Sequence, residues 1–555
     1  MLLQTFPSFQ PRVQDIDLQF SRDRIRSPGS PTSLEFSQIS ELILHAEQDL
    51  SDYEKDIQIV ENVLLDLKRK KEELERYVDH CKAYLPPIRR LPMEIMGEIF
   101  LYYQDLHRSG REDRQFREPL TRPFYSSPAM TALVLSSVCK LWHTTTLATP
   151  QLWSRFSLHI REKCGSLFHL LEIYLSRSKQ HPLTLDLVVN GEGPTSNTII
   201  GLLSAHSHRW VCTSCLYDER LDLNLQTDLP LLQFLEMTCR MPSARSSDSL
   251  NSFAGARTLR TVSLSGIFQF LHSSLRWDQI HFLRAHELRT GDVGLPKYVW
   301  ELTQKCPALR SLELEFDDWP PHEPAGFTSS VHLSKLESLC LEYVMWYSIC
   351  ELFSVSTLPS LRKLLLGLYV EGPTPNTAIF AAFISRSQCF ISVLRLENLE
   401  KPTVQLACDM LHHIPTLTEL IVEEGIMLDK GYHDPLIMAT LMATLRVPPN
   451  PVEADRRSGE NEPVLPLLHR LVMEVNADRF EASRFVDMLE SRGMLAGGSL
   501  GALKSVRLFL QWSNDAEDFT LPLLQPLEAW PGMEIIASTR GSRRYLMNED
   551  SERWV

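Results

Sequence analysis

Two carboxylates in the stretch "LPMEIMGEIF", residues 91–100, lie four residues apart, at Glu94 and Glu98. This spacing places both side chains on one face of a helix. Paired carboxylates can perform general acid–base catalysis when their environments separate their pKa values. The surrounding residues offer no group for a complementary role, so we interpret the pair as a solvated helix face or a polar contact.

A second candidate for chemistry is "GGSLG", residues 497–501, which matches the Gly-x-Ser-x-Gly pattern of a hydrolase nucleophile. That pattern works only where a strand precedes the serine and a helix follows it. Here the segment before it, "RFVDMLESRGMLA", has helical spacing, and the segment after it, "LKSVRLFL", reads as a strand. The order is reversed, so we predict a loop without a catalytic serine.

Metal and cofactor patterns are weak throughout the chain. Cys212 and Cys215 in "CTSC" have the spacing of half a zinc site, but no second pair stands at a suitable distance. His412 and His413 would point to different faces of a helix, and the two glycines of "NGEGPTSN" lack the third glycine of a dinucleotide loop. We therefore expect no metal, no cofactor and no enzymatic activity.

Composition narrows the class of protein. The chain has 555 residues, enough for several domains, and a net charge of -14, which argues against general nucleic-acid binding. Its 11 cysteines follow no regular spacing, as is typical of free thiols in a reducing compartment. The N-terminus "MLLQTFPSFQ" lacks the pattern of a secretion signal, and no apolar run is long enough to cross a bilayer. We expect a cytoplasmic or nuclear protein that does not enter a membrane.

The N-terminal part divides at about residue 36. Residues 1–36 are rich in Ser, Pro, Arg and Asp, and we expect them to be disordered. Residues 37–85 contain no Gly or Pro, and apolar residues recur there at alternating steps of three and four, with only Lys71 polar. This period of 3.5 residues predicts a coiled-coil helix. The seam includes Ile43, Leu50, Ile57, Val60, Leu64, Leu67, Leu74 and Val78.

Two interpretations of this helix remain open. The seam can pair with a partner helix or a second copy of the chain, giving a homodimer. Alternatively, the long helix can dock against the rest of its own chain.

A different pattern governs the C-terminal part of the chain, with apolar residues at the first, fourth and sixth positions of a short unit. Examples are "LRSLEL" at Leu309 and "LESLCL" at Leu336. Nine copies begin at Leu232, Leu259, Leu309, Leu336, Leu361, Ile391, Leu417, Leu468 and Leu503. Most successive copies are 25 to 30 residues apart, and the two longest gaps are 50 and 51, about twice the unit. "LRAHEL" at Leu283 fits as a degenerate copy in the first long gap, whereas the second contains a polar insertion.

Self-similarity at this period predicts a solenoid, because each short strand buries its apolar side only by stacking on its neighbours. The unit resembles leucine-rich repeats, in which each copy contributes one strand and one helix or turn. "LPKYVWELTQKCP" and "NTAIFAAFISRSQ" have the spacing of such helices. We expect the solenoid to cover residues 165–535, followed by a tail at residues 536–555.

Three short motifs lie between the coiled coil and the solenoid, in residues 86–160. "LPMEIMGEIF" carries a stripe of apolar residues at helical spacing, "VCKLW" ends in Trp142, and "PQLW" closes the unit. In this order they resemble the F-box, a small three-helix motif. The matching residues are Leu91, Pro92, Glu94, Ile95, Ile99, Phe100, Val138, Cys139, Lys140, Trp142, Pro150, Leu152 and Trp153. The chain as a whole is then an α/β protein with an N-terminal coiled-coil helix, an F-box and a leucine-rich-repeat-like solenoid.

The resemblance implies a function. An F-box binds the small adaptor subunit of a cullin–RING ubiquitin ligase, and the remainder of such a chain captures a protein substrate. All the matching residues except Lys140 and Pro150 are candidates for the adaptor-binding surface. The alternative is that Leu91, Ile95, Phe100, Val138 and Trp142 form the core of the small unit. For Trp142 and Trp153 we favour this core position. A scaffolding protein that uses the same coil and solenoid outside a ligase is the alternative function.

One departure from the family concerns the connection between the first two helices. Asp105 and Leu106 fit the Asp-Leu pair of the usual short turn, but a polar insertion then follows at about residues 107–128. Such an insertion is tolerable because the cost of closing a loop grows slowly with its length. It leaves open how the adaptor docks beside it.

Overall fold

The structure is a computed structural model of the full chain. It describes residues 7–14, 16, 18–26, 28–82, 84, 87–115, 131–161, 165–190, 194–218, 223, 228–241, 246–266, 270–288, 295–316, 328–369, 377–425, 436–447, 464–476, 480–493, 503–512 and 532–539. The chain folds as two compact units, Met1–Met96 and Gly97–Val555.

The first unit is dominated by one long helix. It contains α1 (Leu18–Arg26), α2 (Ser33–Lys82), the 3-10 turn η1 (Pro87–Arg90) and the first turn of α3 (Met93–Gln115). Glu35, in the first turn of α2, accepts hydrogen bonds from the backbone and hydroxyl of Thr32 at 2.8 and 2.9 Å. This arrangement satisfies donors at the helix start, and it lowers the pKa of Glu35, mainly through the backbone hydrogen bond.

All eight seam residues of α2 are exposed, from 40% for Val78 to 66% for Leu50. Within the first unit, the described residues therefore leave the predicted seam exposed. Residues 7–14, which lie in the segment expected to be disordered, contact the same helix. The backbone and hydroxyl of Ser8 both donate to Asp56 at 2.6 Å, and Arg12 donates to Asp49 at 2.8 Å. Helix α1 also falls within that segment.

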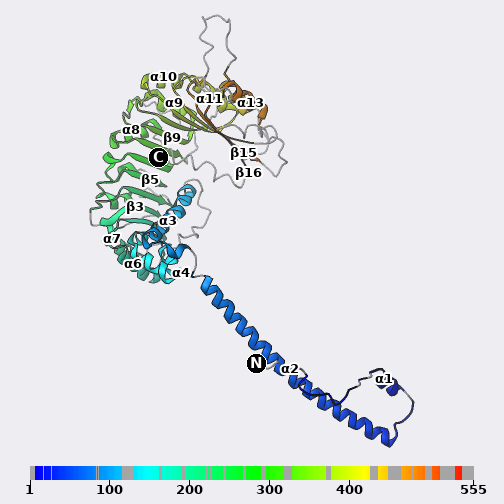
Figure 1. The fold of residues 1–555 in the computed structure, drawn as a ribbon. Helices are drawn as coiled ribbons and strands as arrows, with labels where there is room; N and C mark the ends of the chain where they lie inside the picture. Colours follow the sequence, from blue (N-terminus) through cyan, green and yellow to red (C-terminus); the bar gives the residue numbers. More distant parts are fainter. Residues whose placement is uncertain are drawn as a thin grey trace. The chain divides into compact units, whose positions relative to one another are not determined.

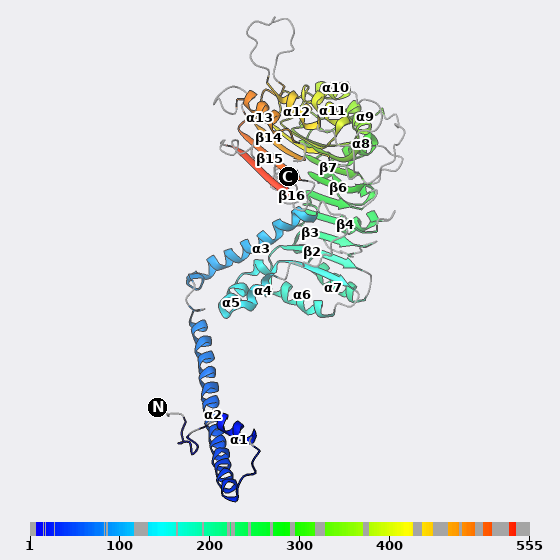
Figure 2. The same ribbon diagram turned by 90° about the vertical axis from the view of Figure 1, so that its right-hand side faces the viewer.

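The second unit contains most of α3 and the remaining helices. They are α4 (Thr131–Val138), α5 (Lys140–Ala148), η2 (Pro150–Trp153), α6 (Gly165–Arg177), α7 (Pro194–Ala205), η3 (Ser207–Arg209), η4 (Ser246–Phe253), η5 (Phe270–His272), η6 (Trp277–Gln279), α8 (Leu295–Lys305), α9 (Trp346–Val355), α10 (Ala378–Ser387), α11 (Lys401–Leu411), α12 (Leu436–Leu445) and α13 (Ala482–Ser491). Helices α6 to α13 lie on one side of a long sheet (Figures 1 and 2).

The sheet is built from strands that alternate with these helices and turns. The strands are β1 (Arg155–Arg161), β2 (Leu183–Asn190), β3 (Trp210–Tyr217), β4 (Phe234–Cys239), β5 (Thr261–Ser265), β6 (Phe282–Leu288), β7 (Ser311–Phe316), β8 (Val331–His332), β9 (Ser338–Met345), β10 (Ser356–Thr357), β11 (Lys363–Tyr369), β12 (Val393–Leu399), β13 (Glu419–Glu424), β14 (Arg470–Asn476), β15 (Ser505–Trp512) and β16 (Met533–Thr539). Fourteen of them form one parallel sheet, while β8 and β10 pair separately.

Strand order in the sheet follows chain order without reversal, from β1 to β16. Each successive repeat therefore adds its strand at the same edge of the sheet, which is the arrangement of a solenoid. A doubly wound sheet would instead reverse its strand order at a switch point. The expected α/β class, with a long N-terminal helix and a solenoid-like parallel sheet, is confirmed.

The apolar positions of the repeat form rows across the sheet. One row places the fourth template position of each copy against the same position of the next, and its members are at most 1% exposed. It includes Leu235, Val262, Leu283, Leu312, Leu339, Leu364, Leu394, Leu420, Leu471 and Val506. Because side chains alternate along a strand, this register packs one face against the helices. The opposite face carries charged residues together with buried apolar ones such as Leu365, Ile421 and Val472.

All nine predicted copies lie at strands of the large sheet, and the two predicted helices are α8 and α10. The degenerate copy was placed in the wrong frame, however. Leu283 pairs with Val262 and Leu312, so it occupies the fourth template position, and the copy begins at Ile280. In the second long gap β13 pairs directly with β14, so no described strand separates them. The polar insertion predicted there, residues 448–463, lies outside the described residues.

The limits of the sheet differ from the predicted boundaries. The sheet begins at β1, within the segment expected to belong to the small helical unit, because Arg155–Arg161 pairs in full register with β2. It ends at β16, which extends to Thr539, beyond the expected limit at residue 535. Residues 540–555 of the predicted tail lie outside the described part.

Two buried arginines hydrogen-bond with backbone carbonyl groups of neighbouring repeats. Arg492 donates from Nε to the carbonyl of Leu445 at 2.6 Å, and from Nη1 and Nη2 to Leu465 and Val464 at 3.2 and 2.6 Å. Burial lowers its pKa to about 10. Arg209 binds the carbonyl of His181 in a similar way. A planar guanidinium suits this role because its several donors can satisfy carbonyls of neighbouring loops at once.

Among the helices that the structure describes, none has the length and apolar character required to cross a membrane.

Candidate functional site

The residues of the first F-box motif lie at the start of α3, with Leu91 and Pro92 just before the helix and Glu94 and Ile95 in its first turn. Pro92 stands immediately before the helix, and its carbonyl accepts the amide hydrogen bond of Met96 at 3.1 Å. Pro92, Glu94 and Ile95 are exposed, Ile95 to 49%, and Leu91 is half-buried. The side chains predicted to contact a partner are thus accessible on this turn, apart from the partly covered Leu91.

In the second unit, α3 continues and packs on α5 and η2. The rings of Phe100 and Trp142 lie 4.8 Å apart, and Gln104 Nε2 donates to the carbonyl of Leu152 at 3.3 Å. The helix approaches closely at Gly97, where a Cβ would lie 3.0 Å from Thr149 Oγ1. These contacts fix the face of α3 that is turned toward the small helices.

Three residues assigned to the adaptor-binding surface are buried instead. Phe100 is 2% exposed, and Leu152 and Trp153 are fully buried. Trp153 donates from Nε1 to the carbonyl of Thr146 at 2.8 Å, and its ring packs 5.0 Å from that of Tyr174. Trp153 thus contributes to the contact with α6, whereas Phe100 packs on Trp142, and all three side chains lie in the core rather than on the exposed surface.

We call α3, α4, α5 and η2 the helical unit. Its exposed apolar side chains lie on α3, α4 and α5. Ile99 and Val138, both predicted, are 43% and 56% exposed, and Cys139 and Trp142 are half-buried. The prediction missed further exposed apolar residues, namely Tyr102, Tyr103, Val134 and Leu147. Tyr102 and Tyr103 follow Ile99 by three and four positions, so extending the helical period past residue 100 would have found them.

The connection after this stripe differs from the expected turn. Asp105 and Leu106 lie inside α3, which continues as a helix to Gln115 and so covers part of the predicted insertion. Asp105 forms an ion pair with Arg155, the first residue of β1. The Asp-Leu pair is therefore not a turn here. The remainder of the insertion, residues 116–130, lies outside the described residues.

A second candidate surface is the face of the sheet opposite the helices. In five repeats the residue directly after the template is a glutamate, and these residues form what we call the glutamate row. Its members are Glu315, Glu342, Glu397, Glu423 and Glu474. Glu315 pairs in register with Glu342, and Glu423 with Glu474. Each follows a buried template residue and so projects from the opposite face.

Cations lie among these carboxylates. Arg395 Nη2, in a side chain only 3% exposed, lies 2.7 Å from Glu397 and 3.8 Å from Glu423. His286 hydrogen-bonds with Glu315. Burial lowers the pKa of His286, but the hydrogen bond and charge of Glu315, together with Glu313, outweigh it and raise the pKa overall.

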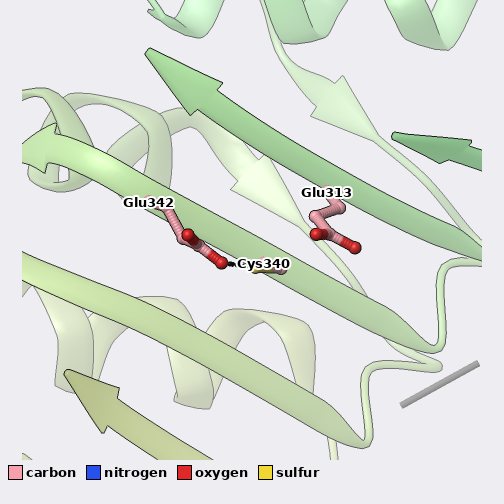
Figure 3. A group of neighbouring side chains, drawn as sticks. All are labelled: Glu313, Cys340 and Glu342. Carbon is pink, nitrogen blue, oxygen red and sulfur yellow. Dashed lines mark hydrogen bonds between the residues drawn. The ribbon is translucent and has the colours of Figure 1, made fainter. Parts of the chain in front are cut away.

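One cluster in this region has donor atoms suited to a metal ion. Figure 3 shows Glu313 of β7 beside Cys340 and Glu342 of β9, with one ligand atom of each within 4.8 Å of the others. Glu313 already pairs with Arg284 at 2.7 Å. Burial, followed by the charges of Glu342 and Glu313, raises the pKa of the Cys340 thiol and keeps it protonated. A metal would have to displace the arginine and the thiol proton, so we interpret the cluster as part of an ionic network.

A basic pocket of about 350 Å³ opens at β14 and β15. It is lined by His469, Arg470, Lys504, Ser505 and Arg507. Arg470 and Arg507 are ion-paired, with Glu419 at 2.9 Å and Glu534 at 2.7 Å. The polar face of the sheet thus combines an acidic central part with a basic part nearer its C-terminal end.

The remaining motifs occupy structural positions or lie outside the described residues. Cys212 and Cys215 are on strand β3, three residues apart, and therefore point to opposite faces. His412 follows α11, and its Nδ1 lies 2.9 Å from the carbonyl of Cys408. "GGSLG" and the two glycines of "NGEGPTSN" lie outside the described residues, but helix α13 precedes the former and strand β15 follows it.

No known family model matches this chain, and no curated protein matches it.

Proposed function

We propose that this protein is the substrate-recognition subunit of a cullin–RING ubiquitin ligase of the SCF type. The helical unit would bind the small adaptor subunit, in the manner of an F-box, and the leucine-rich-repeat-like solenoid would bind a protein substrate. The protein itself would contribute no catalytic group.

The observation that carries the proposal is the exposed apolar stripe of α3 beside a parallel solenoid. Ile95 and Ile99 lie one helical turn apart and are both more than 40% exposed. Phe100, on the same helix, is buried against Trp142. A small unit that anchors one face of a helix and exposes apolar residues on another is suited to hold a partner. A solenoid in turn offers an extended surface for a protein ligand.

A binding titration with the purified adaptor subunit tests this function. The full chain is expected to bind the adaptor, and Ile95→Asp or Ile99→Asp to weaken binding by roughly thirtyfold or more, because a charge would be buried in an apolar interface. Pro92→Ala is expected to weaken it less. Leu231→Asp is the matched control, because Leu231 is 42% exposed and lies outside the helical unit.

The alternative function, a scaffolding protein outside any ligase, makes a different prediction in the same experiment. A scaffold would show no binding to the adaptor, whatever residue stands at position 95 or 99. Binding that is equally weakened by Leu231→Asp would also count against the proposed surface.

A further inference from the structure

A ladder of backbone hydrogen bonds runs along the edge of the sheet where the strands begin. The amide of Arg260 donates to the carbonyl of Gln233 at 3.0 Å, and the same bond recurs from repeat to repeat as far as Lys504, at 2.7 to 3.0 Å. The residues of this ladder occupy the second template position of each copy, and we call them the edge row. Its members are Gln233, Arg260, His281, Arg310, Glu337, Arg362, Ser392, Thr418, His469 and Lys504.

The edge row is basic in a chain whose net charge is -14. It contains three arginines, one lysine and two histidines, but only one carboxylate, that of Glu337. Its basic members are exposed, except for the half-buried His281. Positive charge is therefore accessible along this edge of the sheet.

Several of these cations have no carboxylate partner. Within the part of the chain that the structure describes, no ion pair or side-chain hydrogen bond involves Arg362, Lys504 or the exposed Lys335 nearby. Arg260 donates from Nη1 to the carbonyl of Gln279 at 3.0 Å, a neutral acceptor that does not cancel its charge. Arg310 pairs with Glu337 at 3.2 Å, but the two side chains are 61% and 50% exposed, and such exposed pairs are weak.

The half-buried His281 lies between Arg260 and Arg310 in the ladder. Burial lowers the pKa of its imidazole, and the positive charges of Arg260, Arg310 and Lys335 lower it further. Three cations therefore lie close enough to act on one side chain, and their fields add at this edge.

The basic pocket lies at the C-terminal end of the same row. His469 and Lys504 line it together with Ser505. The two arginines of the pocket are already paired with glutamates, so Lys504 is the cation that remains to meet an anion there. The positive edge thus continues into a hollow that can admit a carboxylate.

We propose that the edge row binds an extended acidic segment of a partner protein. Carboxylates of the segment would pair with Arg260, Arg310 and Arg362, and a further one would reach Lys504. This inference rests on the proposed function only in treating the solenoid as the protein-binding part. It adds the charge and the spacing of the segment that is recognised.

The spacing of the arginines matches that of an extended chain. Arg260, Arg310 and Arg362 directly precede the alternate strands β5, β7 and β11. Adjacent strands are about 4.8 Å apart, so about 9.6 Å separates one arginine position from the next. An extended chain advances about 3.3 Å per residue, so a carboxylate at every third residue would meet each arginine in turn.

The row favours a protein segment over a nucleic acid. Single-stranded nucleic acids are held largely by bases that stack on aromatic rings, and the row contains no Phe, Tyr or Trp. Glu337, in the middle of the row, would repel a continuous phosphate backbone. A segment with a carboxylate at every third residue can instead place a neutral residue opposite Glu337.

Fluorescence anisotropy with the full chain tests the inference. The probe is a labelled 12-residue peptide of repeated Glu-Ser-Ser, compared with the same peptide of repeated Gln-Ser-Ser. We expect the glutamate peptide to bind roughly tenfold more tightly or better, and its affinity to fall with salt. Arg310→Gln and Arg362→Gln are each expected to weaken binding roughly three- to tenfold.

The matched control is Lys297→Gln, which removes the same charge from an exposed position on α8, outside the row, and is expected to leave binding unchanged. Arg362→Lys keeps the charge and is expected to bind more tightly than Arg362→Gln. Equal binding of the two peptides would overturn the inference, and so would equal effects of Arg362→Gln and Lys297→Gln.

A 12-nucleotide RNA of uridines, titrated in the same way, provides the test of the other polyanion. RNA that binds more tightly than the glutamate peptide, and is weakened by Arg362→Gln, would assign the row to nucleic acid and overturn the inference. Weaker binding of the RNA supports a protein segment.

The adaptor titration, run on the same preparations, distinguishes the two proposals. A chain that binds the adaptor but not the glutamate peptide refutes this inference alone. A chain that binds the glutamate peptide with the expected variant pattern, but not the adaptor, refutes the proposed function and supports the edge row as a binding surface.

Discussion

At the scale of the residue, basic side chains on the face of the sheet opposite the helices pair with the glutamates of that face. His286 is the clearest case, because it is buried and hydrogen-bonds with Glu315. Its pKa is raised from the usual 6.5. A histidine whose pKa is higher in the folded than in the unfolded state adds stability below the unfolded pKa. That stability is lost as the pH rises through the folded pKa.

We therefore expect the wild-type chain to have a larger thermal-stability advantage over His286→Gln at about pH 6 than at about pH 9. Differential scanning calorimetry at both pH values measures the two differences. His469→Gln serves as control, because His469 is exposed in the basic pocket. A stability advantage of equal size at both pH values would show that the contribution of His286 to stability does not depend on its charge.

At the scale of the element, each repeat depends on contacts that cross to its neighbour. Arg492, in the cap of α13, donates to three carbonyls of the segments around α12 and β14. Arg492→Met would preserve apolar bulk but leave these buried carbonyls without their donors. Each unsatisfied buried group costs about 1–3 kcal/mol.

Hydrogen exchange of the amides in α12 and β14 measures this contribution, since a solenoid opens locally rather than as one unit. We expect Arg492→Met to speed exchange there by roughly thirtyfold or more, which corresponds to about 2 kcal/mol. Arg484→Met, at an exposed ion pair with Glu481 on the same helix, is expected to change little. Unchanged exchange in Arg492→Met would show that water replaces the arginine.

The elements also show what the sequence could and could not predict. The template placed nine strands correctly, because leucines at fixed spacing must face a common core. It misplaced the copy at Leu283, since Ile280 and Ala285 fill the first and last template positions without a leucine. A place in the core was one of the two interpretations of Phe100 and the favoured one for Trp153. The burial of Leu152 was not predictable, because apolar residues have the same pattern whether they face a core or a partner.

The glutamate row had a signal in the sequence that the template did not include. Each of its members occupies the residue immediately after the last apolar position, as in "LELEF" and "LRLEN". A single glutamate after a strand is ordinary, and only the register of neighbouring strands brings five of them to one level. The stacking of Tyr343 on Tyr369 depends on a positive φ and a shift of register between β9 and β11, which the local sequence does not specify.

At the scale of the whole molecule, we predict that the seam of α2, which is exposed within the first unit, drives self-association. Eight apolar side chains exposed along one helix are costly in water, and a second copy of the same helix would cover them. Light scattering on the full chain is expected to give a dimer. Ile57→Glu combined with Leu64→Glu should give a monomer of 63.7 kDa. Asn62→Glu, on the outer side of the heptad, should leave the dimer intact, and a monomeric wild-type chain would refute this prediction.

We propose above all that the helical unit binds a ligase adaptor. The most direct measurement is the mass, by light scattering after size exclusion, of the full chain mixed with an excess of the adaptor subunit. We expect a stable complex with one adaptor per chain, and its loss in Ile99→Asp but not in Leu231→Asp. A wild-type chain that elutes without the adaptor would contradict it.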